Sequence, residues 1–267
     1  LNLVVGISGE LSLGHAGFMS VGAFTGVIVA TSLQNAVAAG PVRLILAILI
    51  GALFAAIAGV LIGIPVLRLQ GDYLAIVTLA CGEIIKNIIN CLYVGVDGSG
   101  LHFSMTDANA LGMDADGTVI LNGPMGATGV TKLSTFISGI VLVLIVLFIV
   151  QNLVNSRAGR AIKAIRDNRI AAEATGLNVI KYKMMAFVTS AAMAGAAGAL
   201  YALSYSTVVP KKFDFNTSIL ILVFVVLGGI GNLRGSIIAA AVLTVLPELL
   251  REFQDYRMLV YAIVLIL

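Results

Sequence analysis

The sequence contains no tryptophan, only two cysteines and two histidines, and few charged residues: 11% of its 267 residues are Asp, Glu, Lys or Arg. Soluble domains carry about 25% charged residues. With 60% hydrophobic residues and a mean hydropathy of +1.07, the chain has more apolar surface than a water-soluble core can absorb. The composition therefore excludes an ordinary soluble domain and predicts a polytopic membrane protein.

The few cysteines and histidines exclude a disulfide framework and a metal centre. Cys81 and Cys91 fall in one apolar run, where a helix would hold them about 15 Å apart along its axis, too far for a disulfide bond. A zinc site needs about four ligands, whereas His15 has only Glu10 as a nearby acid. We expect no metal and no cofactor.

Nucleotide and hydrolase motifs are also missing. The chain has no G-x-x-x-x-G-K-[ST] loop, which would cradle phosphates, and no G-x-S-x-G elbow to make a hydrolase pair of Ser12 and His15. The sequence therefore predicts a protein that is not an enzyme and has no ATPase site of its own. No nucleic-acid partner is expected.

What the chain has instead is long apolar runs. They reach about 20 residues, the length of a membrane-spanning helix, whereas the strands of a membrane barrel need only about 10. Spans are expected at residues 15–33, 43–67, 71–93, 132–153 and 184–207, with shorter apolar segments at 216–230 and 236–250 and a last span from about Arg257. The predicted fold is all-α, a transmembrane bundle of about eight or nine helices in one domain over 1–267. Because each end falls inside an apolar run, we expect the domain to be truncated at both ends.

Small residues recur along these spans. Gly22 and Gly26 make one G-x-x-x-G pattern, Gly59 and Gly63 make another, and residues 192–199 are nearly all small. Such faces let helix backbones approach closely in lipid, so we predict close helix packing at these positions.

Several polar side chains fall at membrane depth. Glu83 and Lys86 lie three residues apart in the span 71–93, with Glu83 about 18 Å along the helix from its start, and Asn87 follows them. Ionisable side chains inside a membrane are costly and usually face a cavity or a partner. These residues are therefore predicted to line a translocation path; the alternative is a local pair that only holds helices together.

His15 follows a Gly-rich break at residues 8–17, and residues 1–7 have the pattern of the tail of a span. His15 is a further candidate for the translocation path. The alternative is that Ser8, Ser12 and His15 satisfy backbone groups that the break leaves free.

Charge gathers in one block, residues 156–183, with seven Lys or Arg residues and two acids. Apolar residues at helical spacing, a capping Asn168 and a terminating Gly176 predict two short amphipathic helices there. The apolar positions are Ala158, Ala161, Ile162 and Ile165. Such a helix pair is suited to dock a partner; the alternative is that it lies on anionic lipid.

The basic block also orients the chain, because Lys and Arg concentrate in cytoplasmic loops. A cytoplasmic loop at 156–183 places residues 94–131 outside, and that segment has four Asp residues and no Lys or Arg. We therefore expect a periplasmic loop at 94–131. Whether 216–230 crosses the membrane or re-enters stays open.

The stretch "AGRAIKAIRDNRIAAEATGLNVIKYKMMAFVTSAAMAGAAGALYA" (158–202) closely resembles the cytoplasmic loop and following span of bacterial branched-chain amino acid ABC transporter permeases. Residues 1–24, 71–90 and 227–250 are similar to three further blocks of that family, in the same order. Within the family, "GELSLGHAGF" (9–18) is closer to the M-type subunit than to its H-type partner.

The resemblance implies an importer permease in the bacterial cytoplasmic (inner) membrane. Implied partners are a second permease subunit in a heterodimer, two cytoplasmic ATPase subunits and a periplasmic or lipid-anchored substrate-binding protein. The basic block would seat in a groove of an ATPase and couple it to transport. The predicted coupling residues are Arg160, Lys163, Arg166, Asp167, Glu173 and Gly176. Residues 173–176 depart from the Glu-Ala-Ala motif that ABC importers share, so the prediction rests on the family-specific block.

The stretch "GGIGNLRG" (228–235) clusters four glycines between two apolar segments. Each segment has about 15 residues, which is short for about 30 Å of hydrocarbon. Glycines weaken helix continuity and permit conformations closed to other residues, so we predict a hinge. The hinge residues would be Gly228, Gly229, Gly231 and Gly235; the alternative is a tight turn that does not move.

Two other functions stay open. A related ABC permease for urea, amides or sugars would share the loop architecture. An ion-coupled secondary transporter would need an ion site at mid-membrane depth, for which Glu83 is the candidate, and it would not need docking helices.

Overall fold

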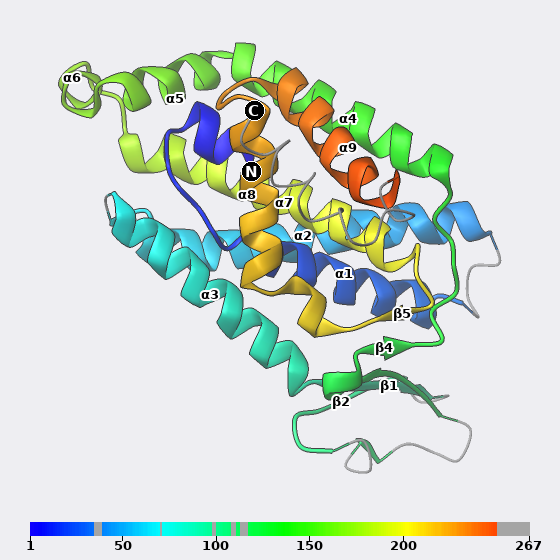
Figure 1. The fold of residues 1–267 in the computed structure, drawn as a ribbon. Coiled ribbons are helices and arrows are strands. Elements are labelled where there is room, and N and C mark those ends of the chain that lie inside the picture. The colour runs from blue at the N-terminus through cyan, green and yellow to red at the C-terminus, as the bar shows by residue number, and fades with distance from the viewer. Residues whose placement is uncertain (35–38, 70, 98–99, 108–110, 113–116, 250–267) are drawn as a thin grey trace.

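The structure is a computed structural model that describes residues 1–34, 39–69, 71–97, 100–107, 111–112 and 117–249. In this part of the chain, five helices are long and apolar enough to cross a membrane: α1 (His15–Ser32), α2 (Gly40–Val66), α3 (Asp72–Asn90), α4 (Phe136–Asn155) and α7 (Val179–Ala202) (Figure 1). Two shorter apolar helices follow, α8 (Phe215–Leu227) and α9 (Leu233–Leu249). Each predicted apolar segment up to residue 249 therefore contains a helix, although the segment expected at 184–207 is helical only to Ala202. The last expected span, from about Arg257, lies outside the described residues.

Shorter elements connect these helices. The chain opens with η1 (Leu3–Ile7), a single π-helical turn, and two short helices, α5 (Arg157–Asp167) and α6 (Arg169–Ala174), join α4 to α7. Two 3-10 turns, η3 (Gly123–Met125) and η4 (Pro210–Phe213), lie beside α3.

The segment between α3 and α4 forms most of a small antiparallel sheet, so the fold is mostly helical, as predicted, but it is not all-α. The strands are β1 (Tyr93–Asp97), β2 (Gly100–Ser104), β3 (Thr118–Asn122), β4 (Ala127–Thr128) and β5 (Thr207–Val208), in the order β2-β1-β3-β4-β5. The register between β1 and β3 shifts at Val94 and Gly95, and a bulge of this kind interrupts the alternation by which a strand is found in a sequence. The last strand, β5, follows α7, so its pairing with β4 depends on a distant part of the chain.

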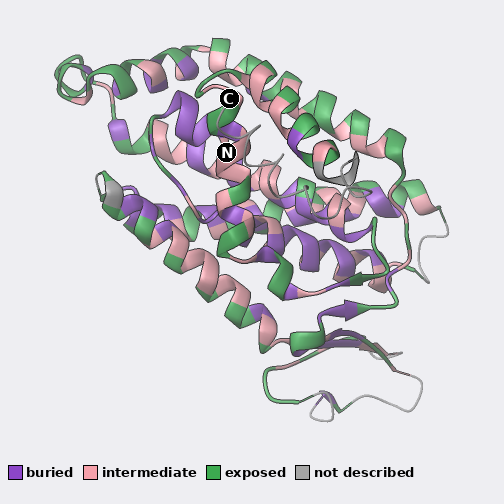
Figure 2. Ribbon diagram, in the orientation of Figure 1, coloured by how far each residue is buried: buried purple, intermediate pink, exposed green. Residues whose placement is uncertain are grey.

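Helices α1, α2 and α7 form the core of the bundle, where buried residues concentrate (Figure 2). A Cβ atom added at Gly22 of α1 would lie 2.1 Å from the carbonyl oxygen of Gly195 in α7. One added at Gly195 would lie 2.3 Å from the Cβ of Ala55 in α2, and one at Gly59 would lie 2.8 Å from the Cβ of Ala191. The backbones touch at these positions, which confirms the predicted close packing of small residues.

Helix α4 lies on the outside of this core. Val150 is its one buried residue, and Phe136 and Phe148 expose 84% and 69% of their surface. A helix that is apolar on all sides yet exposed is suited to contact lipid or neighbouring protein in a membrane.

The bundle has two distinct ends (Figure 1). Helices α5 and α6 lie at one, here named the basic end, and the sheet lies at the other, here named the sheet end. Helix α7 begins at the basic end and starts at Val179, five positions before the expected span at 184, because the Asn178 side chain accepts a hydrogen bond from the Lys181 N–H (3.1 Å) and caps it. Lys181 and Lys183 therefore lie on the first turns of α7 rather than in the loop.

Replacing Gly22 by alanine is expected to destabilise the protein by about 1–3 kcal/mol, because the added methyl group would overlap the α7 backbone. Gly139→Ala is the matched control, since the nearest atom to its added Cβ, Leu200 Cδ2, lies 3.9 Å away. Thermal unfolding of each purified variant in one detergent should give a lower Tm for Gly22→Ala and an unchanged or higher Tm for the control. Equal Tm values for the two variants would contradict the packing described.

Candidate functional site

The basic end carries the predicted pair of amphipathic helices, and both helices have a side-chain cap, of which Asn168 was predicted from the sequence. Ser156 accepts a hydrogen bond from the Gly159 N–H (3.2 Å) at the start of α5, and Asn168 accepts one from the Ala171 N–H (3.0 Å) at the start of α6. Gly176, with φ +85°, follows α6 in the left-handed conformation expected of a helix stop. The predicted pair of short helices is therefore confirmed. It could be predicted because helix periodicity and capping depend on residues close together in the sequence.

The apolar side of this pair packs inward. Ala161, Ile162 and Ile165 are buried, and Ala158 is half-buried. Ile162 packs against Leu3 and Ile7 of η1, while Ile165 packs against Ala172 and Val179. These contacts attach α5 and α6 to the bundle.

The opposite side carries charge. Of the six predicted coupling residues, five are exposed and Lys163 is half-buried. Arg166 pairs with Asp167 (Nη2–Oδ1 3.1 Å), and Arg169 pairs with Glu173 (Nε–Oε1 3.0 Å). Sequence reasoning missed Ile170, whose surface is 81% exposed at the start of α6. The sequence did indicate this exposure, because Ile170 lies four residues after Arg166, on the charged side and outside the apolar stripe.

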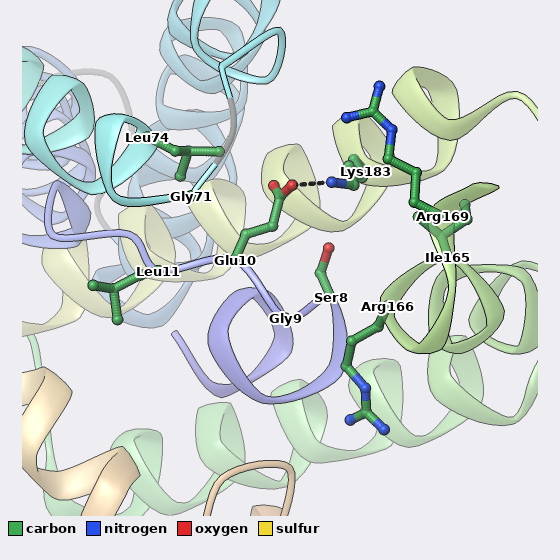
Figure 3. A pocket seen from close by; sticks show the side chains of 10 residues that line it. All are labelled: Ser8, Gly9, Glu10, Leu11, Gly71, Leu74, Ile165, Arg166, Arg169 and Lys183. Carbon is green, nitrogen blue, oxygen red and sulfur yellow. Dashed lines mark hydrogen bonds and ion pairs between the residues drawn. The ribbon is translucent and has the colours of Figure 1, made fainter.

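A cavity of about 360 Å³ lies between the basic block and the rest of the bundle (Figure 3). Its lining comes from the Gly-rich break, the start of α3, the basic block and the start of α7: Ser8, Gly9, Glu10, Leu11, Gly71, Leu74, Ile165, Arg166, Arg169 and Lys183. Glu10 and Lys183 form an ion pair across it, and Figure 3 shows the guanidinium groups of Arg166 and Arg169 pointing away from each other. The cations do not converge on one point, so their arrangement does not favour the binding of a single anion in this cavity.

The predicted membrane-depth residues lie along α3. Lys86 and Glu83 form an ion pair with side chains 18% and 33% exposed, and Asn87 is exposed. The structure adds Asp214, which lines a small hollow with Glu83 and Gly82 of α3. Sequence reasoning placed Asp214 in a connecting loop and did not relate it to α3.

Asp214 caps the start of α8. It accepts a hydrogen bond from the Thr217 backbone N–H (3.0 Å), and this bond lowers the pKa of its carboxyl group, with smaller help from the Thr217 and Asn216 side chains and the charge of Lys86. The carboxylate thus stays ionised beside the Glu83–Lys86 pair.

His15 is buried, with 4% of its surface exposed. Its Nε2 lies 2.8 Å from Ser190 Oγ on α7, and its Nδ1 lies 3.3 Å from Ser12 Oγ. The free N–H groups near the start of α1 find other acceptors, the Leu13 N–H donating to Thr78 (3.1 Å) and the Ala16 N–H to Ser218 (3.3 Å). His15 therefore ties α1 to α7 in this structure, and its role in a translocation path stays a prediction.

The predicted hinge forms the turn between α8 and α9. Gly229 and Gly231 have φ values of +90° and +85°, which other residues rarely adopt. Gly228 and Gly235 serve a different purpose, since a Cβ added at Gly235 would lie 1.9 Å from the Gly228 carbonyl oxygen. The glycines thus permit both the turn and the close contact of the two helices, whereas movement at the turn stays a prediction.

No group of three His, Cys, Asp or Glu residues that could hold a metal ion occurs in the described part of the chain.

Comparison with known proteins gives two kinds of match. The family described as "Branched-chain amino acid transport system / permease component" matches residues 1–267. The high-affinity branched-chain amino acid transport system permease proteins LivM of Escherichia coli (strain K12) and Salmonella typhimurium are 38% and 36% identical over 97% of this chain. The fructose import permease protein FruG of Bifidobacterium longum is 26% identical over 88% of it. No solved structure matches the chain.

The match covers part of the relatives' length. This chain spans 61% of each LivM protein and 67% of FruG. Because the family match extends over the whole chain and agrees with a bundle of apolar helices, the chain belongs to the family of permease components of branched-chain amino acid transport systems.

Proposed function

We propose that this chain is the membrane-spanning permease domain of an ABC importer that moves branched-chain amino acids into the cell. The observation that carries the proposal is the folded, capped helix pair α5–α6 at one end of a membrane bundle, in a chain 38% identical to a LivM permease. The chain itself would hydrolyse no ATP, and two separate ATPase subunits would drive it. A second permease subunit and a substrate-binding protein would complete the importer.

The basic end would face the cytoplasm and the sheet end the periplasm, in the bacterial inner membrane. The excess of Lys and Arg in residues 156–183 supports this orientation. In the same arrangement the basic block is the coupling loop, with Ile170 and the exposed charges of α5 and α6 against the ATPase. The sheet would help to seat the binding protein.

The translocation path would follow the face of α3 that carries Glu83, Lys86 and Asn87, with Asp214 beside them. A second permease subunit covering this face would close the path between the two subunits. The short α8 and α9 and the glycine turn between them would reorient when the ATPases close. The bundle formed by residues 1–267 would contain about eight or nine helices.

A permease for another solute is the second candidate, because FruG is a fructose import permease. Its 26% identity, against 38% for LivM, favours branched-chain amino acids. An ion-coupled secondary transporter is less well supported, because Glu83, its candidate ion ligand, is already paired with Lys86.

Transport in reconstituted vesicles tests the proposed function. The full-length permease, with its partner permease, ATPases and binding protein, is expected to accumulate leucine, isoleucine or valine only when ATP is present on the ATPase side. Fructose and urea, supplied with the same proteins, serve as control solutes. ATP-independent uptake driven by an ion gradient, or uptake of a control solute alone, would overturn it.

Truncating Ile170 to alanine is expected to weaken binding of the ATPase. Full burial of an isoleucine side chain in the interface contributes about 2 kcal/mol to the binding free energy, and its loss raises the dissociation constant about 30-fold. Ile238→Ala on α9, where Ile238 is 64% exposed, is the matched control. Titration of the purified ATPase onto each permease variant measures the effect, and equal dissociation constants for Ile170→Ala and the control would remove Ile170 from the interface.

Thiol labelling tests the orientation. With Cys81 and Cys91 replaced by alanine, a cysteine at exposed Thr118 of the sheet end should react with an impermeant reagent added to intact cells. A cysteine at exposed Thr175 of the basic end should react only after the inner face is opened. The reverse pattern would invert the topology. Ser99, which also falls in the expected periplasmic loop 94–131, lies outside the described residues.

A further inference from the structure

The turn η1 lies between the basic block and the glycine turn of α8–α9. On the side of the basic block, Arg166 Nη1 donates a hydrogen bond to the Gly6 carbonyl oxygen (2.8 Å). Leu3 and Ile7 of η1 pack there with Ile162 of α5. Both a polar and an apolar contact therefore join α5 to η1.

On its other side, η1 is bound to the glycine turn through Asn2. The Asn2 side chain donates to the Asn232 carbonyl oxygen (3.0 Å) and to Ser236 Oγ (2.7 Å), and its Oδ1 accepts from the Gly231 N–H (2.9 Å). Asn2 is only 6% exposed, so these bonds do not compete with bulk water. One buried amide therefore holds both the turn and the first residues of α9.

The backbones of η1 and the glycine turn also touch directly. A Cβ added at Gly6 would lie 2.3 Å from the Gly231 nitrogen and 2.1 Å from Asn2 Oδ1. At Gly6 and Gly231 no side chain lies between the two backbones, so the segments are in direct contact there. The turn η1 is π-helical, a conformation that is rare in proteins.

We infer that Asn2 is a positioning residue that transmits movement of the basic block, through η1, to the glycine turn between α8 and α9. This inference rests on the proposed function, in which the ATPase moves the basic block. The order of contacts is Arg166 to Gly6 of η1, Gly6 to Asn2, which precedes η1, and Asn2 to Gly231. Residues far apart in the sequence thereby form one continuous chain of contacts, of the kind that can carry coupling between two sites.

The test measures movement of the glycine turn in the assembled, full-length transporter. With Cys81 and Cys91 replaced by alanine, a cysteine is placed at Ile230, which is 61% exposed within the turn. The rate of modification by a soluble maleimide is then compared with and without a non-hydrolysable ATP analogue. We expect the two rates to differ by about fivefold or more, the lower range of ordinary coupling between sites, and Asn2→Ala to abolish the difference.

Ser218→Ala is the matched control, because Ser218 is a buried polar residue of α8 that bonds to α1 and lies outside the link. It should retain the nucleotide-dependent difference. Ser236→Ala, which removes one bond to Asn2 from a half-buried position, should reduce the difference even if Asn2→Ala fails to assemble.

The outcomes separate the inference from the proposed function. If the unsubstituted transporter has no ATP-driven uptake, the proposed function fails. If uptake is present but Ile230→Cys shows no nucleotide-dependent rate, or if Asn2→Ala retains the difference, the inference alone is overturned. Should Asn2→Ala not assemble, an undiminished difference in Ser236→Ala overturns it instead.

Discussion

Direct backbone contact between α1, α2 and α7 is the constraint on which the rest of the fold depends. Lipid is as apolar as leucine, so no hydrophobic force draws helices together inside a membrane, and packing must come from close approach. Gly22, Gly195 and Gly59 provide that approach by leaving no side chain between the helices. The sheet, the basic block and the α8–α9 hairpin all attach to this three-helix core.

The non-helical segment before α1 leaves backbone N–H groups without partners in its own segment. The chain there is not helical between residues 9 and 14, and free N–H groups must be satisfied inside the protein. Side chains from other helices do this: Thr78 of α3 and Ser218 of α8 accept these bonds, while Ser190 of α7 holds His15. The same bonds fix α3 and α8 against α1, so the break also organises its neighbours.

The two ends of the bundle are built by different means. At the sheet end, short strands and 3-10 turns bind α3 and the chain after α7 to one another through backbone hydrogen bonds. At the basic end, side chains make the joints, namely the Glu10–Lys183 ion pair and the Arg166 bond to Gly6. Contacts made by side chains tolerate rearrangement better than a ladder of backbone hydrogen bonds. The basic end is therefore better suited than the sheet end to move if an ATPase binds there.

The sequence by itself determined what depends on neighbouring residues. Apolar runs predicted the helices, and Asn168 and Gly176 predicted the ends of α6, because helix periodicity and capping act over three or four residues. Tertiary structure alone decided what depends on distant residues: the pairing of β4 with β5, the position of Asp214 beside Glu83, and the bond from Asn2 to Gly231. No local pattern shows such partners, because a hydrogen bond or an ion pair depends on where the chain returns, and close packing of α1, α2 and α7 sets that path.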